Sequence, residues 1–102
     1  MLEHMVLLKL KPGVTEAQTA DLMQALKNVG HQGGIRGIIS VTGGYNNSPE
    51  GKSAGFDFGF VITFEDAAAR DAYLPHPLHQ ELGRRFVGPI IDGVLVFDFD
   101  IT

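Results

Sequence analysis

The chain has 102 residues, of which 44% are hydrophobic and 20% charged, and this length and composition predict one globular domain over residues 1–102 with a modest core. The net charge is −4 and the Lys and Arg residues are scattered, so we expect no nucleic-acid partner, and no window approaches the ~18 apolar residues of a membrane span. The absence of cysteine excludes disulfides and thiolate chemistry and fits a cytoplasmic protein.

The first part of the chain predicts a strand, a helix and a second strand. Residues 3–11 alternate between two faces, one of which carries His4, and this short apolar run is typical of a strand rather than a signal peptide. Thr15 and Gln18 have the spacing of a capping box, which predicts a helix that ends at Gly30, before a turn over residues 30–34. Residues 35–43 are rich in β-branched residues and predict the second strand.

The second part predicts a strand, two short helices and a last strand. After a polar connection over residues 44–55, residues 56–65 place a row of phenylalanines on one face. Asp66 is expected to cap a short helix that Pro75 ends, and Pro77 suits the first turn of another. In the last strand, residues 93–101, we assign Val94, Val96, Asp98 and Asp100 to the face opposite the phenylalanine row.

This order of elements, β-α-β-β-α-β, predicts an α+β fold of the ferredoxin-like plan, with a four-stranded antiparallel sheet and the helices on one face. The opposite face still carries five apolar residues, and the chain has no spare element to cover it. These residues are Met5, Leu7, Val61, Val94 and Val96. We therefore predict a homodimer in which two sheets pack face to face as a dimeric α+β barrel.

Four segments in order, "HMVLLKLKPGVTEAQ", "GGYNNSPEG", "GFDFGFVITFED" and "AYLPHPLHQEL", resemble the stress-responsive A/B barrel (Dabb) domain family. The resemblance implies a dimeric α+β barrel. The family includes plant stress proteins without assigned chemistry and a polyketide cyclase. In that cyclase a Tyr and a His on the helical segment act on the substrate, which implies Tyr73 and His79 here, and a pocket His on the first strand is matched by His4. Where the cyclase has a further pocket His, this chain has Phe58.

The residues themselves leave two interpretations open for each polar side chain. His79 should be partly buried against the sheet, either as a general base near pH 7 or as a structural residue that bonds a backbone carbonyl across the Pro75–Pro77 corner. Tyr73 is either a hydrogen-bond donor to a ligand oxygen or an ordinary residue at the core edge. His4 is either a hydrogen-bonded core residue or part of a polar cluster in an apolar pocket.

We expect a pocket between the sheet and the helices, lined by His4, Phe58, Phe60 and Phe97, that binds a small hydrophobic or aromatic molecule. One alternative is a cofactor-independent, cyclase-like enzyme with His79 as acid/base and Tyr73 as hydrogen-bond donor. Another is a non-enzymatic stress or scaffold protein with a filled core. We expect no cofactor. We also expect no metal site, because no third ligand accompanies His76 and His79, and His76 is better placed to cap a helix.

Overall fold

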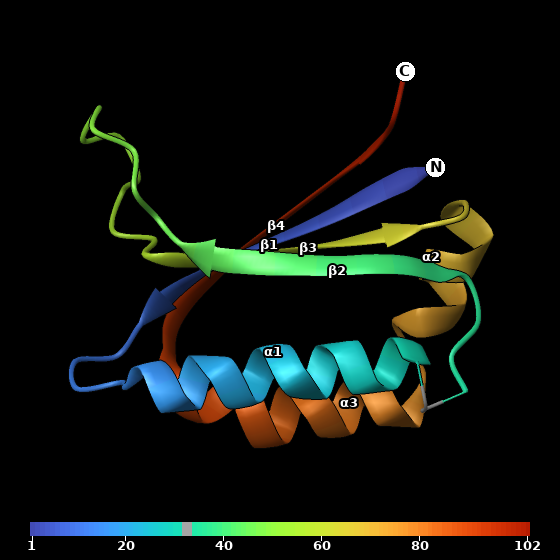
Figure 1. The fold of residues 1–102 in the computed structure, drawn as a ribbon, viewed down its shortest axis with the longest axis horizontal. Helices are drawn as coiled ribbons and strands as arrows, with labels where there is room; N and C mark the ends of the chain where they lie inside the picture. Colours follow the sequence, from blue (N-terminus) through green and yellow to red (C-terminus); the bar gives the residue numbers. More distant parts are fainter. Residues whose placement is uncertain (32–33) are drawn as a thin grey trace.

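The structure, a computed structural model, describes residues 1–31 and 34–102 (Figure 1). In this part of the chain, four strands form one antiparallel sheet with the order β2-β3-β1-β4. The strands are β1 (Leu2–Leu10), β2 (Ile38–Tyr45), β3 (Phe58–Phe64) and β4 (Ile91–Asp100). Because β1 and β3 lie at the centre, β2 and β4 are the two edge strands.

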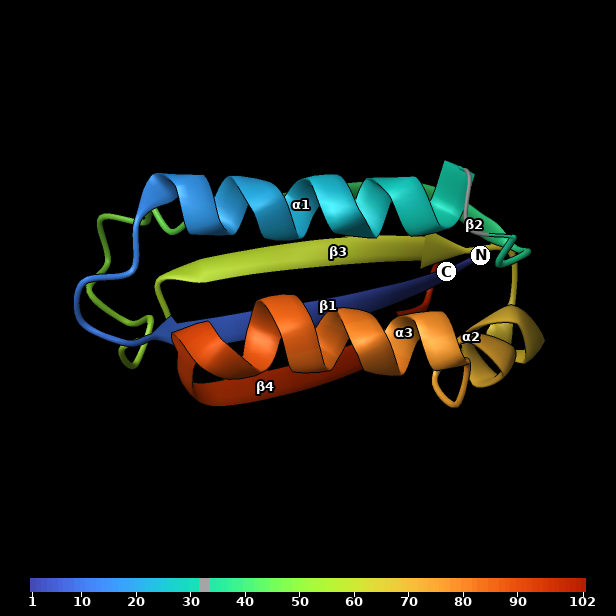
Figure 2. The ribbon, with the colours of Figure 1, turned by 90° about the horizontal axis from the view of Figure 1, so that it is seen from below.

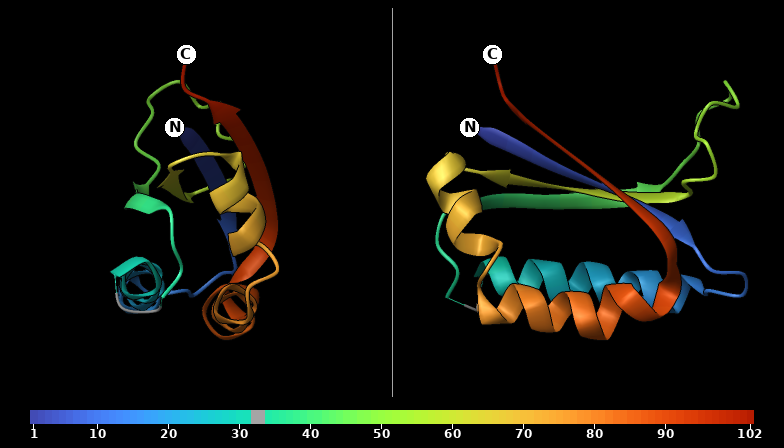
Figure 3. Two further views of the ribbon diagram at one scale, coloured as in Figure 1. Left: turned by 90° about the vertical axis from the view of Figure 1, so that its right-hand side faces the viewer. Right: turned by 180° about the vertical axis from the view of Figure 1, so that it is seen from behind.

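Helices α1 (Glu16–His31) and α3 (Pro77–Leu82) lie on one side of the sheet (Figure 1). Helix α1 runs along β2 and β3, whereas α3 runs along β1 and β4 (Figure 2). Helix α3 continues as a π-helical turn (Gly83–Val87) and a 3-10 turn (Gly88–Ile90). The short helix α2 (Ala67–Tyr73) stands at one end of the sheet and leads down to α3 (Figure 3). The predicted α+β, ferredoxin-like plan is confirmed.

The boundaries of α1 and β2 follow local signals with small shifts. The Thr15 N–H donates to Gln18 Oε1 at 2.9 Å and the Gln18 N–H donates to Thr15 Oγ1 at 3.3 Å, so the capping box is present. Helix α1 continues through Gly30 to His31, and residues 32–33 of the predicted turn lie outside the described residues. Strand β2 begins three residues later than predicted and ends at Tyr45.

Both predicted caps around the proline corner are present. The Asp66 carboxylate accepts from the Ala69 N–H at 2.9 Å at the start of α2. His76 Nδ1 accepts from the Leu78 N–H at 3.1 Å at the start of α3. His76 therefore serves as the helix cap that the sequence predicted.

The core lies between the helices and one face of β1 and β3. Alternating residues of these two strands are buried against the helices, as predicted: His4, Val6, Leu8, Phe58, Phe60, Ile62 and Phe64. The helices contribute Leu22, Leu26, Tyr73 and Leu82. This buried face positions the candidate site described below.

Strand β4 corrects the predicted assignment of faces. Its register with β1 pairs His4 with Asp98 and Val6 with Val96, so Val94, Val96 and Asp98 point to the helix side. Phe97, predicted to line the pocket, lies on the other side with a 66% exposed side chain. Hydrophobicity favoured the opposite assignment, because the row on the helix side includes Asp98 whereas the other row carries Leu95, Phe97 and Phe99. The larger side chains lie on the face that has no cover within the chain.

The sheet face turned away from the helices, called the outer face below, is apolar along its centre. It carries Met5, Leu7, Val61, Leu95, Phe97 and Phe99. Residues 46–57, called the arm below, connect β2 to β3 and rise on the same side (Figure 1). Among residues 1–31 and 34–102, no helix is long and apolar enough to cross a membrane.

Two adjacent glycines of β2 provide a test of this packing. A Cβ at Gly43 would lie 2.8 Å from Met23 Sδ and 2.9 Å from Phe60 Cβ, whereas one at Gly44 would meet nothing within 4 Å. We expect Gly43→Ala to lower the free energy of unfolding by about 1–3 kcal/mol through overpacking. Gly44→Ala should leave it unchanged or raise it by up to ~1 kcal/mol, because alanine loses less backbone entropy. Urea titration measures both, and equal effects would contradict the orientation of β2.

Candidate functional site

A cavity of about 260 Å³, called the histidine cavity below, lies between the sheet and the helices. Its polar lining residues are His4, Tyr73, His79 and Asp98. Its apolar walls include Val6, Leu26, Phe60, Leu82, Val94 and Val96. The structure therefore brings together four residues that the sequence singled out: His4, Phe60, Tyr73 and His79. They come from β1, β3, α2 and α3.

The Tyr73 ring forms the centre of the polar cluster. It is only 2% exposed, and its centroid lies 4.4 Å from that of His79 and 6.1 Å from that of His4. Burial raises the pKa of Tyr73 above its ordinary value of 10.0, because the low-dielectric surroundings disfavour a phenolate. The Tyr73 hydroxyl therefore keeps its proton at neutral pH and is available as a hydrogen-bond donor.

His79 combines a structural bond with a second ring nitrogen that has no partner among the described residues. Its Nδ1 lies 2.7 Å from the Leu74 carbonyl oxygen, across the proline corner. Because a carbonyl oxygen only accepts, Nδ1 carries the proton, and in the neutral ring Nε2 then holds a lone pair. The structural interpretation of His79 is thus realised, and it leaves Nε2 able to accept a proton.

His4 belongs to a chain of polar contacts that the sequence did not predict. Its Nδ1 lies 2.8 Å from Asp98 Oδ1, and Arg70 Nη1 donates to Asp98 Oδ2 at 3.1 Å. The hydrogen bond to Asp98, followed by that to Asp71, raises the pKa of Arg70. An ionised carboxylate only accepts, so the His4 ring donates from Nδ1, and in the neutral ring Nε2 is then the acceptor.

The described residues provide no partner for the Tyr73 hydroxyl or for Nε2 of either ring. Within this part of the chain, every fully enclosed side-chain nitrogen or oxygen has a hydrogen-bond partner. The Tyr73 hydroxyl and the two Nε2 atoms are therefore not fully enclosed, and the residues that carry them line the cavity. One donor and two acceptors are available to a molecule bound there.

Sequence reasoning missed Asp98 and Arg70 for different reasons. Asp98 was assigned to the outer face, and only the register of β4 against β1 places it opposite His4. Arg70 reaches Asp98 over 28 residues of sequence, a contact that no local pattern signals. The order of elements, which sets β4 antiparallel beside β1, is the signal that could have placed Asp98 near His4.

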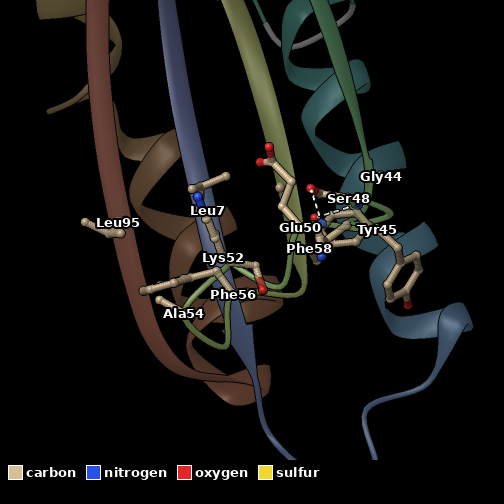
Figure 4. Close-up of a pocket in the computed structure, with 13 residues that line it drawn as sticks. Leu7, Gly44, Tyr45, Ser48, Glu50, Lys52, Ala54, Phe56, Phe58 and Leu95 are labelled. Atoms are coloured by element: carbon tan, nitrogen blue, oxygen red, sulfur yellow. Dashed lines mark hydrogen bonds between the residues drawn. The ribbon is translucent and has the colours of Figure 1, made fainter.

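Phe58 and Phe97 do not line the histidine cavity. Phe97 lies on the outer face, and Phe58 packs near the other end of the sheet, where its ring centroid is 5.0 Å from that of Tyr45. Phe58 instead lines a cavity of about 470 Å³ under the arm, together with Leu7, Phe56 and Leu95 (Figure 4).

The polar lining of the arm cavity comes from the arm itself, including Ser48, Glu50 and Lys52, whose side chains are drawn in Figure 4. Glu50 and Lys52 are exposed, so this cavity lacks the buried, convergent titratable groups of the histidine cavity. Residues 1–31 and 34–102 contain no cluster of three or more His, Cys, Asp or Glu side chains suited to hold a metal ion.

Solved structures with the same fold cover nearly the whole chain. The protein At3g17210 of Arabidopsis thaliana has 29% identity and a TM-score of 0.89, covering 100% of this chain and 96% of that one. A dimeric ferredoxin-like protein of unknown function from Jannaschia sp. CCS1 has 31% identity and a TM-score of 0.81, covering 98% of each chain. The hydroxynitrile lyase of Passiflora edulis has 19% identity and a TM-score of 0.83, covering 99% of this chain and 93% of that one.

A comparison with curated proteins found no match. The family model described as the stress responsive A/B barrel domain matches residues 2–101, which is nearly the full length of the sequence. The resemblance seen in the four sequence segments is thereby confirmed. The chain belongs to the stress responsive A/B barrel (Dabb) domain family.

Proposed function

We propose that the protein binds a small molecule with an apolar body and one oxygen-bearing group in the histidine cavity. The observation that carries this proposal is the mixture of an apolar wall with three polar side chains, those of His4, Tyr73 and His79, contributed by three different elements. Apolar cavities with a few convergent polar groups are the usual form of small-molecule sites. The cavity also argues against the alternative of a filled core.

The available hydrogen-bonding groups favour a neutral hydroxyl, enol or carbonyl over an anionic head group. The Tyr73 hydroxyl can donate to the ligand oxygen, and an imidazole Nε2 can accept from a ligand hydroxyl. The described lining residues include no Lys or Arg, and the nearby charge of Arg70 is paired with Asp98. A carboxylate or phosphate would therefore be buried without a counter-charge, which is costly.

A matched pair of ligands tests this proposal. We expect 4-propylphenol to bind more tightly than propylbenzene, because only the phenol uses the polar cluster. Tyr73→Phe should weaken phenol binding by about fivefold, the value of one hydrogen bond of ~1 kcal/mol, and leave propylbenzene unchanged. Ligand-observed NMR or calorimetry measures both, and native mass spectrometry of freshly purified protein shows whether a molecule is retained.

Gly83→Leu serves as the cavity-filling control. Gly83 lines the cavity, has helical backbone angles, and a Cβ there would meet nothing within 4 Å. Leucine is a better helix former than glycine, so the variant should fold while it excludes both ligands. Equal affinity of wild type and Gly83→Leu for both ligands, or no binding by the wild type, would contradict the proposed site.

A second candidate function is proton transfer at carbon next to a ligand carbonyl. The observation that favours it is that both Nδ1 atoms are held by acceptors, which leaves both Nε2 atoms as bases. His79 would take the proton and the Tyr73 hydroxyl would stabilise the enolate oxygen. The hydroxynitrile lyase neighbour does not bear on this question, because 19% identity concerns the fold alone.

Deuterium uptake by an aryl ketone tests this chemistry without the natural substrate. We expect the protein to speed exchange at the methyl group of 4-propylacetophenone in D₂O, followed by proton NMR. His79→Ala should lower the rate by a factor on the order of 10², the contribution of a general base. Tyr73→Phe should lower it as well. If the wild-type protein binds the ketone but the exchange rate equals that in buffer alone, proton transfer is excluded and ligand binding remains as the proposed function.

We further infer that the protein is a homodimer that buries its outer face. Phe97, Leu95 and Phe99 are 66%, 50% and 41% exposed, a cluster of large apolar side chains that soluble proteins usually cover. Relatives of the same fold from Jannaschia, Thermobifida fusca and Bacteroides fragilis are described as dimeric. A standard interface buries about 800 Å² per partner, which is a small part of the 6295 Å² accessible surface of the chain.

Light scattering coupled to size exclusion tests this assembly. We expect the wild type to have twice the 11.0 kDa mass of the chain at micromolar concentration. Phe97→Glu should shift it to a monomer, because a carboxylate would be buried in an apolar interface. Leu78→Glu is the control, since Leu78 is 37% exposed on the helix side. A stable wild-type monomer would overturn the inference.

A further inference from the structure

Asp98 divides its two carboxylate oxygens between two partners from different elements. Oδ1 lies 2.8 Å from His4 Nδ1, on β1, and Oδ2 accepts from Arg70 Nη1 at 3.1 Å, on α2. Asp98 itself lies on the edge strand β4, with a side chain that is 19% exposed. Three elements that are distant in sequence therefore meet at one carboxylate.

We propose that Arg70 is a positioning residue of the histidine cavity, which fixes the Asp98 carboxylate so that the neutral His4 ring carries its proton on Nδ1 and its lone pair on Nε2. This inference rests on the proposed ligand site. Arg70 does not line the cavity, so it acts through Asp98 rather than on the ligand.

The need for such a residue follows from the freedom of a carboxylate on an edge strand. The terminal torsion of an Asp side chain is broad, so a single hydrogen bond to His4 leaves the group free to rotate towards water. A guanidinium has planar donors in a fixed arrangement and stays charged. Its bond to Oδ2 therefore restricts the rotation and keeps Oδ1 directed at His4.

Arg70 also links the element that carries the donor Tyr73 to the Asp98 carboxylate that contacts the acceptor His4. Tyr73 lies three residues further along the same short helix, and the Arg70–Asp98 ion pair ties that helix to β4. Helix α2 has only seven residues, too few to be stable by itself. The ring centroids of Tyr73 and His4 are 6.1 Å apart. The ion pair thus helps to fix the position of Tyr73 relative to His4.

The second partner of Arg70 supplies a matched control. Arg70 Nε donates to Asp71 Oδ1 at 3.1 Å, but the Asp71 side chain is 65% exposed and Asp71 is not among the residues that line the cavity. Asp71→Asn removes an acidic partner of Arg70 without changing the contact to Asp98. If Arg70 acts through Asp98, this substitution leaves the site unaltered.

Ring ¹⁵N shifts of His4, assigned with His4→Gln, report the tautomer in the ligand-free protein. We expect one Nδ1–H tautomer in wild type and Asp71→Asn, and a mixture of tautomers in Arg70→Met. In Arg70→Met, the ratio of the affinity for 4-propylphenol to that for propylbenzene should also fall about fivefold, the value of one weakened hydrogen bond. The affinity for propylbenzene should not change. Arg70→Lys should recover most of both, because one N–H contacts Asp98.

If Arg70→Met fails to fold, Arg70→Gln replaces it with the same expectations, since glutamine also lacks the charge. A single Nδ1–H tautomer and a full phenol preference in the uncharged variant would overturn the role of Arg70 while leaving the ligand site intact. A wild type that binds neither ligand would overturn the ligand site, and the tautomer measurement would still decide whether Arg70 orients His4 through Asp98.

Discussion

The antiparallel pairing of β1 with β4 is the constraint on which the candidate site depends. It sets His4 opposite Asp98 and Val6 opposite Val96, which gives the cavity a polar end and an apolar wall on adjacent strands. A register shifted by one residue would turn Asp98 to the outer face and leave the His4 ring buried without its acceptor. The cost of leaving a buried polar group unpaired therefore favours the observed register, independently of any ligand.

The helical segment that closes the cavity is built from short pieces. Pro75 and Pro77 interrupt it, α3 has six residues, and a π-helical turn follows. π-helical turns within helices occur often at functional sites, because they displace side chains from the regular spacing. Here the turn begins at Gly83, whose missing side chain leaves open space at the wall. The irregularity of this segment is thus consistent with a cavity in place of a filled core.

Local signals in the sequence predicted most of the fold. The capping box at Thr15, the caps at Asp66 and His76, and the buried face of β1 and β3 are each set by residues close together in the chain. The faces of β4 were predicted wrongly because the row that includes Asp98 is the less apolar of the two, yet pairing with β1 turns that row to the helices. The contact between Arg70 and Asp98 was not predicted, because only the assembled sheet and helix bring the two residues together.

Strand β4 has a consequence for how this protein can diverge. Its even-numbered residues, Val94, Val96 and Asp98, form a wall of the cavity, while the odd-numbered Leu95, Phe97 and Phe99 form the outer face. Point substitutions in this strand can therefore change the histidine cavity and the apolar surface separately. The insertion or loss of one residue exchanges both at once. Residues of the two surfaces can therefore be compared position by position only with relatives that have the same number of residues between the π-helical turn and the end of β4.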